Sequence, residues 1–122
     1  MRFKDYFNND FETGENHYLP ELKTRYYRCT KEQAIDAVLA LVEEENAQMK
    51  DIVEQYNEYF FQGKDYTCII TITGTRIAET AIDIKVTTYK LIPRGLGKKI
   101  IERMYKYFDS KLPFKGVSLY KD

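Results

Sequence analysis

Two periodic patterns in this sequence predict an α+β fold, with one antiparallel sheet and two helices on one of its faces. Residues 66–73 and 80–91 alternate apolar and polar side chains, as half-buried strands do. Residues 31–46 and 98–111 repeat apolar side chains every three or four positions, as amphipathic helices do. An isolated hairpin is only marginally stable in water, so further strands and a helix must complete the fold. The predicted order is β-α-β-β-β-β-α.

The composition is that of one soluble domain. The chain has 122 residues, 43% hydrophobic and 31% charged, which is ordinary for a globular protein. A chain of this length buries about two thirds of its unfolded surface, enough for a hydrophobic core that needs no disulfide or metal ion. Eleven tyrosines and seven phenylalanines are more distinctive. Tyrosine packs like a hydrophobe but needs a partner for its hydroxyl, so most are expected at the edge of the core. A tyrosine-rich binding surface is the alternative.

Residues 1–20 are predicted to form an arm, and residues 21–122 a single α+β domain. The arm is polar and rich in turn-forming residues, with five aromatic side chains that follow no sustained period. It is expected to lie over the domain through these aromatics, because disordered tails are usually poor in them. Disorder in isolation and docking on a second subunit are the alternatives.

A first strand is predicted at residues 21–29 and is followed by a helix. Residues 30–33, Thr-Lys-Glu-Gln, form a capping-box pattern, in which the threonine hydroxyl and the glutamine side chain satisfy backbone amides reciprocally. Apolar residues then form one stripe until the helix ends near Asn46, a residue type suited to the left-handed conformation that often follows a helix.

The next stretch permits two interpretations. Residues 43–57 could extend the helix, since several of them are compatible with it. Strand-preferring types are nevertheless concentrated here, with Asn57 and Glu58 placed where a tight turn would lie. We therefore predict a hairpin of strands 49–56 and 59–63.

The hairpin of residues 66–91 is predicted to place its apolar row on the helices. The opposite face is rich in threonine and half hydrophobic, as expected for an antiparallel sheet with one wetted side. This second face is a candidate interaction surface, made of Thr67, Ile69, Thr71, Thr87 and Tyr89. After Pro113 ends the last helix, residues 112–120 are expected either to add a short edge strand or to lie over the sheet.

This order of elements resembles the TATA-binding-protein-like and short helix-grip-like folds, over residues 22–111. The resemblance rests on element order alone, so it transfers no functional residue. Helix-grip proteins often hold an apolar ligand between a curved sheet and the long last helix. Here the sheet is expected to be two strands short of the full ligand-binding form.

Catalytic and metal chemistry find little support in the sequence. The one histidine, His17, has no recognisable nucleophile near it, and no zinc-binding or hydrolase motif occurs. Cys29 and Cys68 belong to no Cys-x-x-Cys pair and are predicted to be buried free thiols. We therefore expect no enzyme activity, no cofactor and no metal.

The start of the last helix is a candidate anion site. Two glycines let the backbone approach a ligand, and a helix N-terminus presents unpaired amides. The residues concerned are Arg94, Gly95, Gly97, Lys98 and Lys99. This is no P-loop, because its first glycine and the Ser or Thr after the lysine are missing. An ordinary strand-to-helix turn is the alternative.

Charge is segregated along the chain although the net charge is zero. Residues 31–58 carry two basic and eight acidic side chains, and residues 85–115 carry nine basic and two acidic ones. These blocks are expected to be solvated or paired within the fold. Pairing between subunits, or contact of the basic block with nucleic acid, are the alternatives.

The sequence thus favours a non-catalytic binding module that contacts another protein or itself as a homodimer. The alternative is an anion, nucleotide or nucleic-acid binder that uses residues 94–99. Nucleic acid is disfavoured by the zero net charge. Residues 1–5 lack the apolar core of a signal peptide, and no apolar run approaches the roughly 18 residues of a membrane span. We expect a cytoplasmic protein with no membrane partner.

Overall fold

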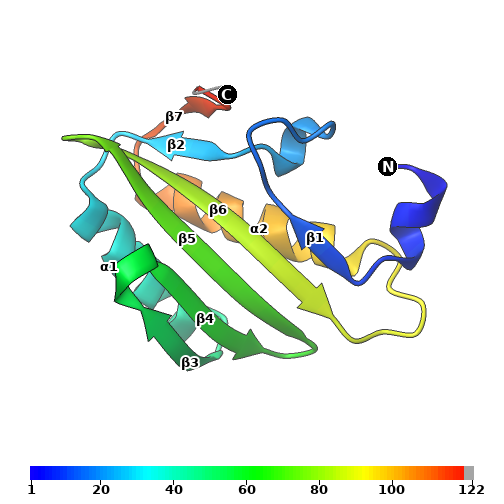
Figure 1. Cartoon of the computed structure of the whole chain (residues 1–122). Coiled ribbons are helices and arrows are strands. Elements are labelled where there is room, and N and C mark those ends of the chain that lie inside the picture. Colours follow the sequence, from blue (N-terminus) through cyan, green and yellow to red (C-terminus); the bar gives the residue numbers. More distant parts are fainter. Residues whose placement is uncertain (120–122) are drawn as a thin grey trace.

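Two long strands, β5 (Tyr66–Arg76) and β6 (Glu79–Thr88), form the centre of the computed structural model, which describes residues 1–119 (Figure 1). They pair antiparallel, with Ile70 opposite Ile84 and Ile72 opposite Ile82. All four isoleucines are buried, so the predicted apolar row faces the core. β6 ends at Thr88, three residues earlier than predicted, because its partner strand β5 begins at the opposing residue, Tyr66.

Within the described residues the sheet has seven strands, in the order β3-β4-β5-β6-β2-β7, and β1 also pairs with β6. The other strands are β1 (Asp10–Glu12), β2 (Arg25–Tyr27), β3 (Gln48–Val53), β4 (Glu58–Gly63) and β7 (Phe114–Val117). All strand pairings are antiparallel. The predicted α+β class is confirmed, and β1 and β7 enlarge the five-stranded sheet that we predicted. The element order is compatible with the fold resemblance noted above.

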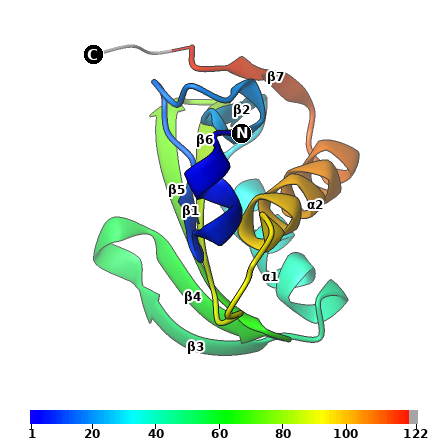
Figure 2. The ribbon, with the colours of Figure 1, turned by 90° about the vertical axis from the view of Figure 1, so that its right-hand side faces the viewer.

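Two helices, α1 (Lys31–Glu44) and α2 (Leu96–Lys111), lie on one side of the sheet (Figure 2). The predicted capping box is present: the Thr30 hydroxyl accepts from the Gln33 amide at 3.2 Å, and the Gln33 side chain accepts from the Thr30 amide at 2.8 Å. Asn46 has a φ of 51°, the left-handed conformation expected there. α2 begins at Leu96, two residues earlier than predicted. The prediction left Gly97 out because glycine is a poor helix former, but here it lies in the first turn of the helix and packs on Phe11 of β1.

The hairpin prediction for residues 49–63 is confirmed, and the alternative of a longer first helix is wrong. β3 and β4 pair along their length, with a register shift between Met49 and Asp51. A single 3₁₀ turn, Glu54–Tyr56, and the left-handed residue Asn57 (φ 52°) connect the two strands. Asn57 takes this conformation readily because its short polar side chain tolerates it.

The first predicted strand is shorter than expected. Residues Pro20–Leu22 form a 3₁₀ turn that buries Leu22, and only Arg25–Tyr27 pair as β2. β1 and β2 pair with the same edge of β6, opposite residues 85–87 and 80–82 respectively. The intervening chain therefore leaves this edge and returns to it.

Both ends of the described chain lie against the sheet or α2. A 3₁₀ helix, Phe3–Phe7, precedes β1, and the carbonyl of Tyr6 accepts from the Arg94 amide at 2.7 Å. Of the two alternatives for the tail, an edge strand is present, since β7 pairs with β2. Residues 120–122 lie outside the described residues.

The side of the sheet that faces the helices is filled by packed side chains. Fully buried groups from both layers meet there, namely Phe61, Ile70, Ile72, Ile82, Ile84, Ile101, Met104 and Phe108. Polar links reinforce the contact with α2. Arg25 and the Tyr27 hydroxyl both reach the Asp109 carboxylate, at 2.7 and 2.8 Å, and the Tyr105 hydroxyl donates to the Ile82 carbonyl at 2.8 Å.

Gly97→Ala should destabilise the protein, because the new Cβ would lie 2.7 Å from Cδ2 of the buried Phe11. We expect a loss of about 1–3 kcal/mol in the free energy of unfolding, despite the better helix propensity of alanine. Urea unfolding measures it. Gly74→Ala is the control, since its Cβ would meet no atom within 4 Å. Equal stability of Gly97→Ala and the wild type would contradict the packing of β1 on α2.

Candidate functional site: the open face of the sheet

The face of the sheet opposite the helices carries the residues that the sequence singled out. β5 and β6 place Thr67 opposite Thr87, Ile69 opposite Lys85 and Thr71 opposite Asp83, all with side chains on this open face. Tyr89 follows β6, but its hydroxyl lies 3.2 Å from the Thr67 hydroxyl. The structure therefore brings all five residues of the predicted interaction surface together.

The open face is hollowed by a pocket lined from β1, β4, β5 and β6, and we call this hollow the trough. Figure 2 shows the tip of the β3–β4 hairpin and the loop after β1 standing out on the side away from the helices. Between them lies a pocket of about 200 Å³, lined chiefly by Glu12, Glu58, Ile69, Thr71, Asp83 and Lys85. Ile69 and Thr71 are the members that sequence reasoning identified.

Sequence reasoning missed the acidic residues of this pocket. Its carboxylates come from three strands: Glu12 from β1, Glu58 from β4 and Asp83 from β6. Lys85 is the basic residue among them. The alternation of β6 was a usable signal for Asp83 and Lys85, since both fall on the same face as Thr87. Glu12 and Glu58 carried no such signal, because their positions follow from strand pairing.

Asp83 is the structural anchor of this site. Its Oδ1 accepts hydrogen bonds from the Thr13 and Thr24 hydroxyls, both at 2.7 Å. Thr13 also accepts from the Ile84 amide at 2.9 Å. These bonds hold both ends of the segment between β1 and β2 against β6. Burial raises the pKa of Asp83; the two threonine bonds oppose this shift without cancelling it, and the charge of Glu15 adds to it.

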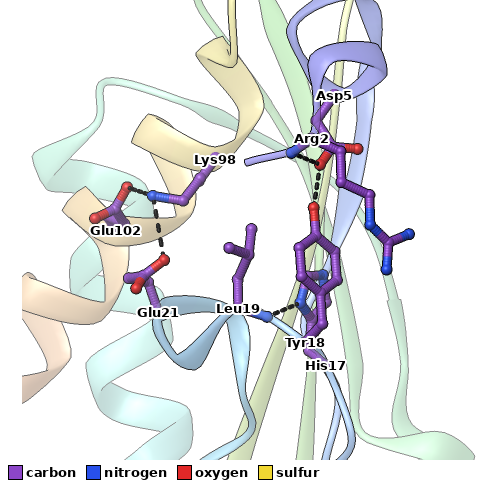
Figure 3. Close-up of polar contacts among 8 residues, drawn as sticks. All are labelled: Arg2, Asp5, His17, Tyr18, Leu19, Glu21, Lys98 and Glu102. Atoms are coloured by element: carbon purple, nitrogen blue, oxygen red, sulfur yellow. Dashed lines mark hydrogen bonds and ion pairs between the residues drawn. The ribbon is translucent and has the colours of Figure 1, made fainter.

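Three of the five predicted anion-binding residues have structural roles. Gly95 has a φ of 74°, which favours glycine, and Gly97 leaves room for Phe11. Lys98 pairs with Glu102 at 2.7 Å and with Glu21 at 3.5 Å (Figure 3). The two glycines thus serve the turn and the packing, and Lys98 is already neutralised.

Arg94 and Lys99 differ from these three residues. Both side chains are exposed, and neither forms an ion pair within residues 1–119.

Two residues that precede the 3₁₀ turn Pro20–Leu22, His17 and Tyr18, also have polar partners (Figure 3). The Tyr18 hydroxyl donates to the Asp5 carboxylate, and Nδ1 of His17 accepts from the Leu19 amide at 3.0 Å. Burial lowers the pKa of His17 despite nearby carboxylates.

A second polar cluster joins the two charge blocks. Arg103 of α2 makes two hydrogen bonds to Glu45, at 2.9 and 2.5 Å, and the Tyr66 hydroxyl donates to the same carboxylate at 2.7 Å. Burial alone would raise the pKa of Glu45, but the bonds from Arg103 and Tyr66 lower it. A pocket of about 380 Å³ opens beside this cluster. Three of its five charged lining groups, Glu45, Asp65 and Arg103, are already paired, so it offers a ligand less than the open face does.

Other reactive groups are scarce. Cys29 and Cys68 are buried free thiols, as predicted, and burial raises the pKa of both. Neither is therefore an activated nucleophile. Among residues 1–119, no three His, Cys, Asp or Glu side chains are grouped so as to hold a metal ion. In the same part of the chain, no helix has the length and apolar character to span a membrane.

Asp83→Asn should change the pH dependence of stability. Because burial raises the pKa of Asp83, the native state keeps a proton that the unfolded state loses, at pH values just above the usual aspartate range. The free energy of unfolding therefore falls as pH rises through this window. The amide cannot ionise, so the variant should lose that part of the slope in urea unfolding across pH. Glu43→Gln, an exposed change on α1, is the control. An unchanged slope in Asp83→Asn would contradict the burial of this carboxyl.

Comparison with known proteins gives this geometry no counterpart. No protein-family model, no curated protein and no solved structure matches the chain. Its function must therefore be inferred from the residues themselves.

Proposed function

We propose that this protein is a non-catalytic binding module that holds a basic polypeptide segment on the open face of its sheet. One observation carries the proposal: three carboxylates line a pocket of about 200 Å³ on the open face of the sheet. We place the protein in the cytoplasm, as the sequence suggested.

Charge favours a cationic occupant. Glu12, Glu58 and Asp83 outnumber the single Lys85 in the pocket lining, and Asp10 extends the acidic side along β1. An acidic surface attracts lysine and arginine side chains and repels phosphate. Nucleic acid is therefore a poor occupant of this face.

The shape and chemistry of the trough suit an extended peptide. Lysine and arginine can lay their methylene stems on an apolar surface while the charged head reaches a carboxylate, and Ile69 supplies that surface here. The Thr71 hydroxyl can donate and accept hydrogen bonds. The Thr87 hydroxyl donates to Asp10 but can still accept, and the Thr67 hydroxyl shares a hydrogen bond with Tyr89. A surface with both apolar and polar groups can select particular side chains along a bound peptide.

Self-association through this face is less favourable. In a twofold dimer the same patch meets itself, so two acidic surfaces would oppose one another. Like charges in contact destabilise an interface by several kcal/mol. We therefore favour a different protein over a second copy as the occupant of the open face.

The alternative proposal is an anion, nucleotide or nucleic-acid binder at residues 94–99. The side chains of Arg94 and Lys99 favour it, since both are exposed and form no ion pair among residues 1–119. Such binding would weaken steeply with salt. The ion pairs of Lys98 count against it, since they occupy one of the three cations.

The first proposal predicts binding of a fluorescent nona-arginine peptide, measured by anisotropy at low ionic strength. The double variant Glu12→Lys with Glu58→Lys should weaken binding by about tenfold or more, because it reverses two charges at the pocket. Glu43→Lys with Glu44→Lys is the matched control, since it makes the same change in net charge on the exposed side of α1. No binding by the wild type, or equal loss in both double variants, would overturn the proposal.

A further inference from the structure

We infer that one end of the molecule docks on anionic lipid surfaces through an apolar knob, made of Phe3, Phe7, Leu91 and Ile92. This inference rests on different residues from the open face and stands independently of the function proposed above. It departs from the expectation of no membrane partner, which rested on the lack of a spanning segment, because reversible contact with a membrane surface needs none.

The knob joins two segments that are distant in sequence. The 3₁₀ helix Phe3–Phe7 lies beside the loop that leads into α2, held by the hydrogen bond from the Arg94 amide to the Tyr6 carbonyl. Figure 1 shows both segments at the same end of the molecule, and Figure 2 views that end directly. Asn9 fixes the loop as well, since its side-chain amide donates to the Lys90 carbonyl at 2.9 Å.

The four side chains are unusually exposed for their size. Phe3 is 80% exposed and Leu91 98%, while Phe7 and Ile92 are more than half exposed. The rings of Phe3 and Phe7 lie edge to face, with centroids 5.3 Å apart. The transfer of such exposed leucine and phenylalanine side chains from water into an apolar phase lowers the free energy.

Basic residues are frequent in the two segments that carry this apolar group. Residues 1–7 and 89–99 contain six basic side chains and one acidic one. Lys98 is paired on α2, but Lys4, Arg94 and Lys99 are exposed and form no ion pair within residues 1–119. Asp5, the acidic member, accepts from the Tyr18 hydroxyl. Lys90 is also paired, with Asp65 at 3.4 Å. Lys4, Arg94 and Lys99, three of the six basic side chains, therefore carry the uncompensated positive charge of these two segments.

These two properties favour a lipid surface as the occupant. A nearly fully exposed leucine at the tip of a loop makes a convex surface, whereas ligand sites for small molecules are concave. A bilayer accepts a convex apolar group without shape complementarity, and its anionic headgroups attract lysine and arginine. A second copy of this chain would bring the same positive charge to the contact and be repelled.

The orientation is compatible with simultaneous use of the open face. In Figure 1 the knob lies at one edge of the view, while the open face of the sheet turns towards the viewer and the helices lie behind it. A surface that touches the knob leaves the trough accessible.

The test is co-sedimentation of the full chain with vesicles of phosphatidylcholine, with and without phosphatidylserine. We expect the wild type to bind only the vesicles that contain phosphatidylserine, and salt to weaken the binding. Phe3→Ser with Leu91→Ser, and separately Lys4→Glu with Lys99→Glu, should each reduce the partition coefficient by about tenfold or more. All four positions are exposed, so the variants should fold; circular dichroism checks this.

Two controls match these changes at the other end of the molecule. Ile77→Ser removes an apolar side chain that is 96% exposed in the β5–β6 turn, and Arg28→Glu with Lys111→Glu reverses two exposed charges far from the start of α2. Both should bind vesicles like the wild type. The inference is overturned if the wild type does not sediment, if the controls lose as much binding as the knob variants, or if the serine variant binds normally. Binding to polyglutamate or RNA without binding to vesicles would also overturn it.

Discussion

The strict alternation of side chains along β5 and β6 is the constraint on which the whole structure depends. A strand has a side-chain period of two, so a slip of one residue in the pairing would turn every isoleucine outwards. The pairing of Ile70 with Ile84 and of Ile72 with Ile82 fixes the register and gives α1 and α2 a continuous apolar surface. The same register places the threonines, Asp83 and Lys85 together on the opposite side. Core and candidate site are thus two consequences of one pairing.

The edge of β6 shows how the fold supplies the remaining parts of the site. Two short strands share this edge, and neither would be stable without it. Asp83 binds the hydroxyls of Thr13 and Thr24, so it fastens the chain where β1 ends and where β2 is about to begin. This fastening brings Glu12 to the pocket. A carboxyl with a raised pKa is the consequence, because the anchor sits where water is partly excluded.

The periodic parts of the fold were predictable, and the parts set by long-range pairing were not. The central hairpin, both helices, the capping box at Thr30 and the left-handed Asn46 all follow from local chemistry. β1 has three residues, too few to show a period, and its partner is more than 70 residues away in sequence. The threonine and isoleucine positions of the site were predicted for the same reason as the core. Glu12 and Glu58 reach the pocket only through pairing with β6 and β5, which no local pattern reveals.

Cysteine accessibility tests the central claim most directly, because Cys29 and Cys68 are buried and provide an unreactive background. Thr71→Cys and Ile72→Cys place new thiols at adjacent positions on opposite faces of β5. Under native conditions the account predicts rapid labelling at residue 71 by a charged thiol reagent and protection at residue 72, at every protein concentration. Protection of residue 71 at high protein concentration would show that copies of the chain cover the open face. Labelling of residue 72 as fast as residue 71 would contradict the register itself.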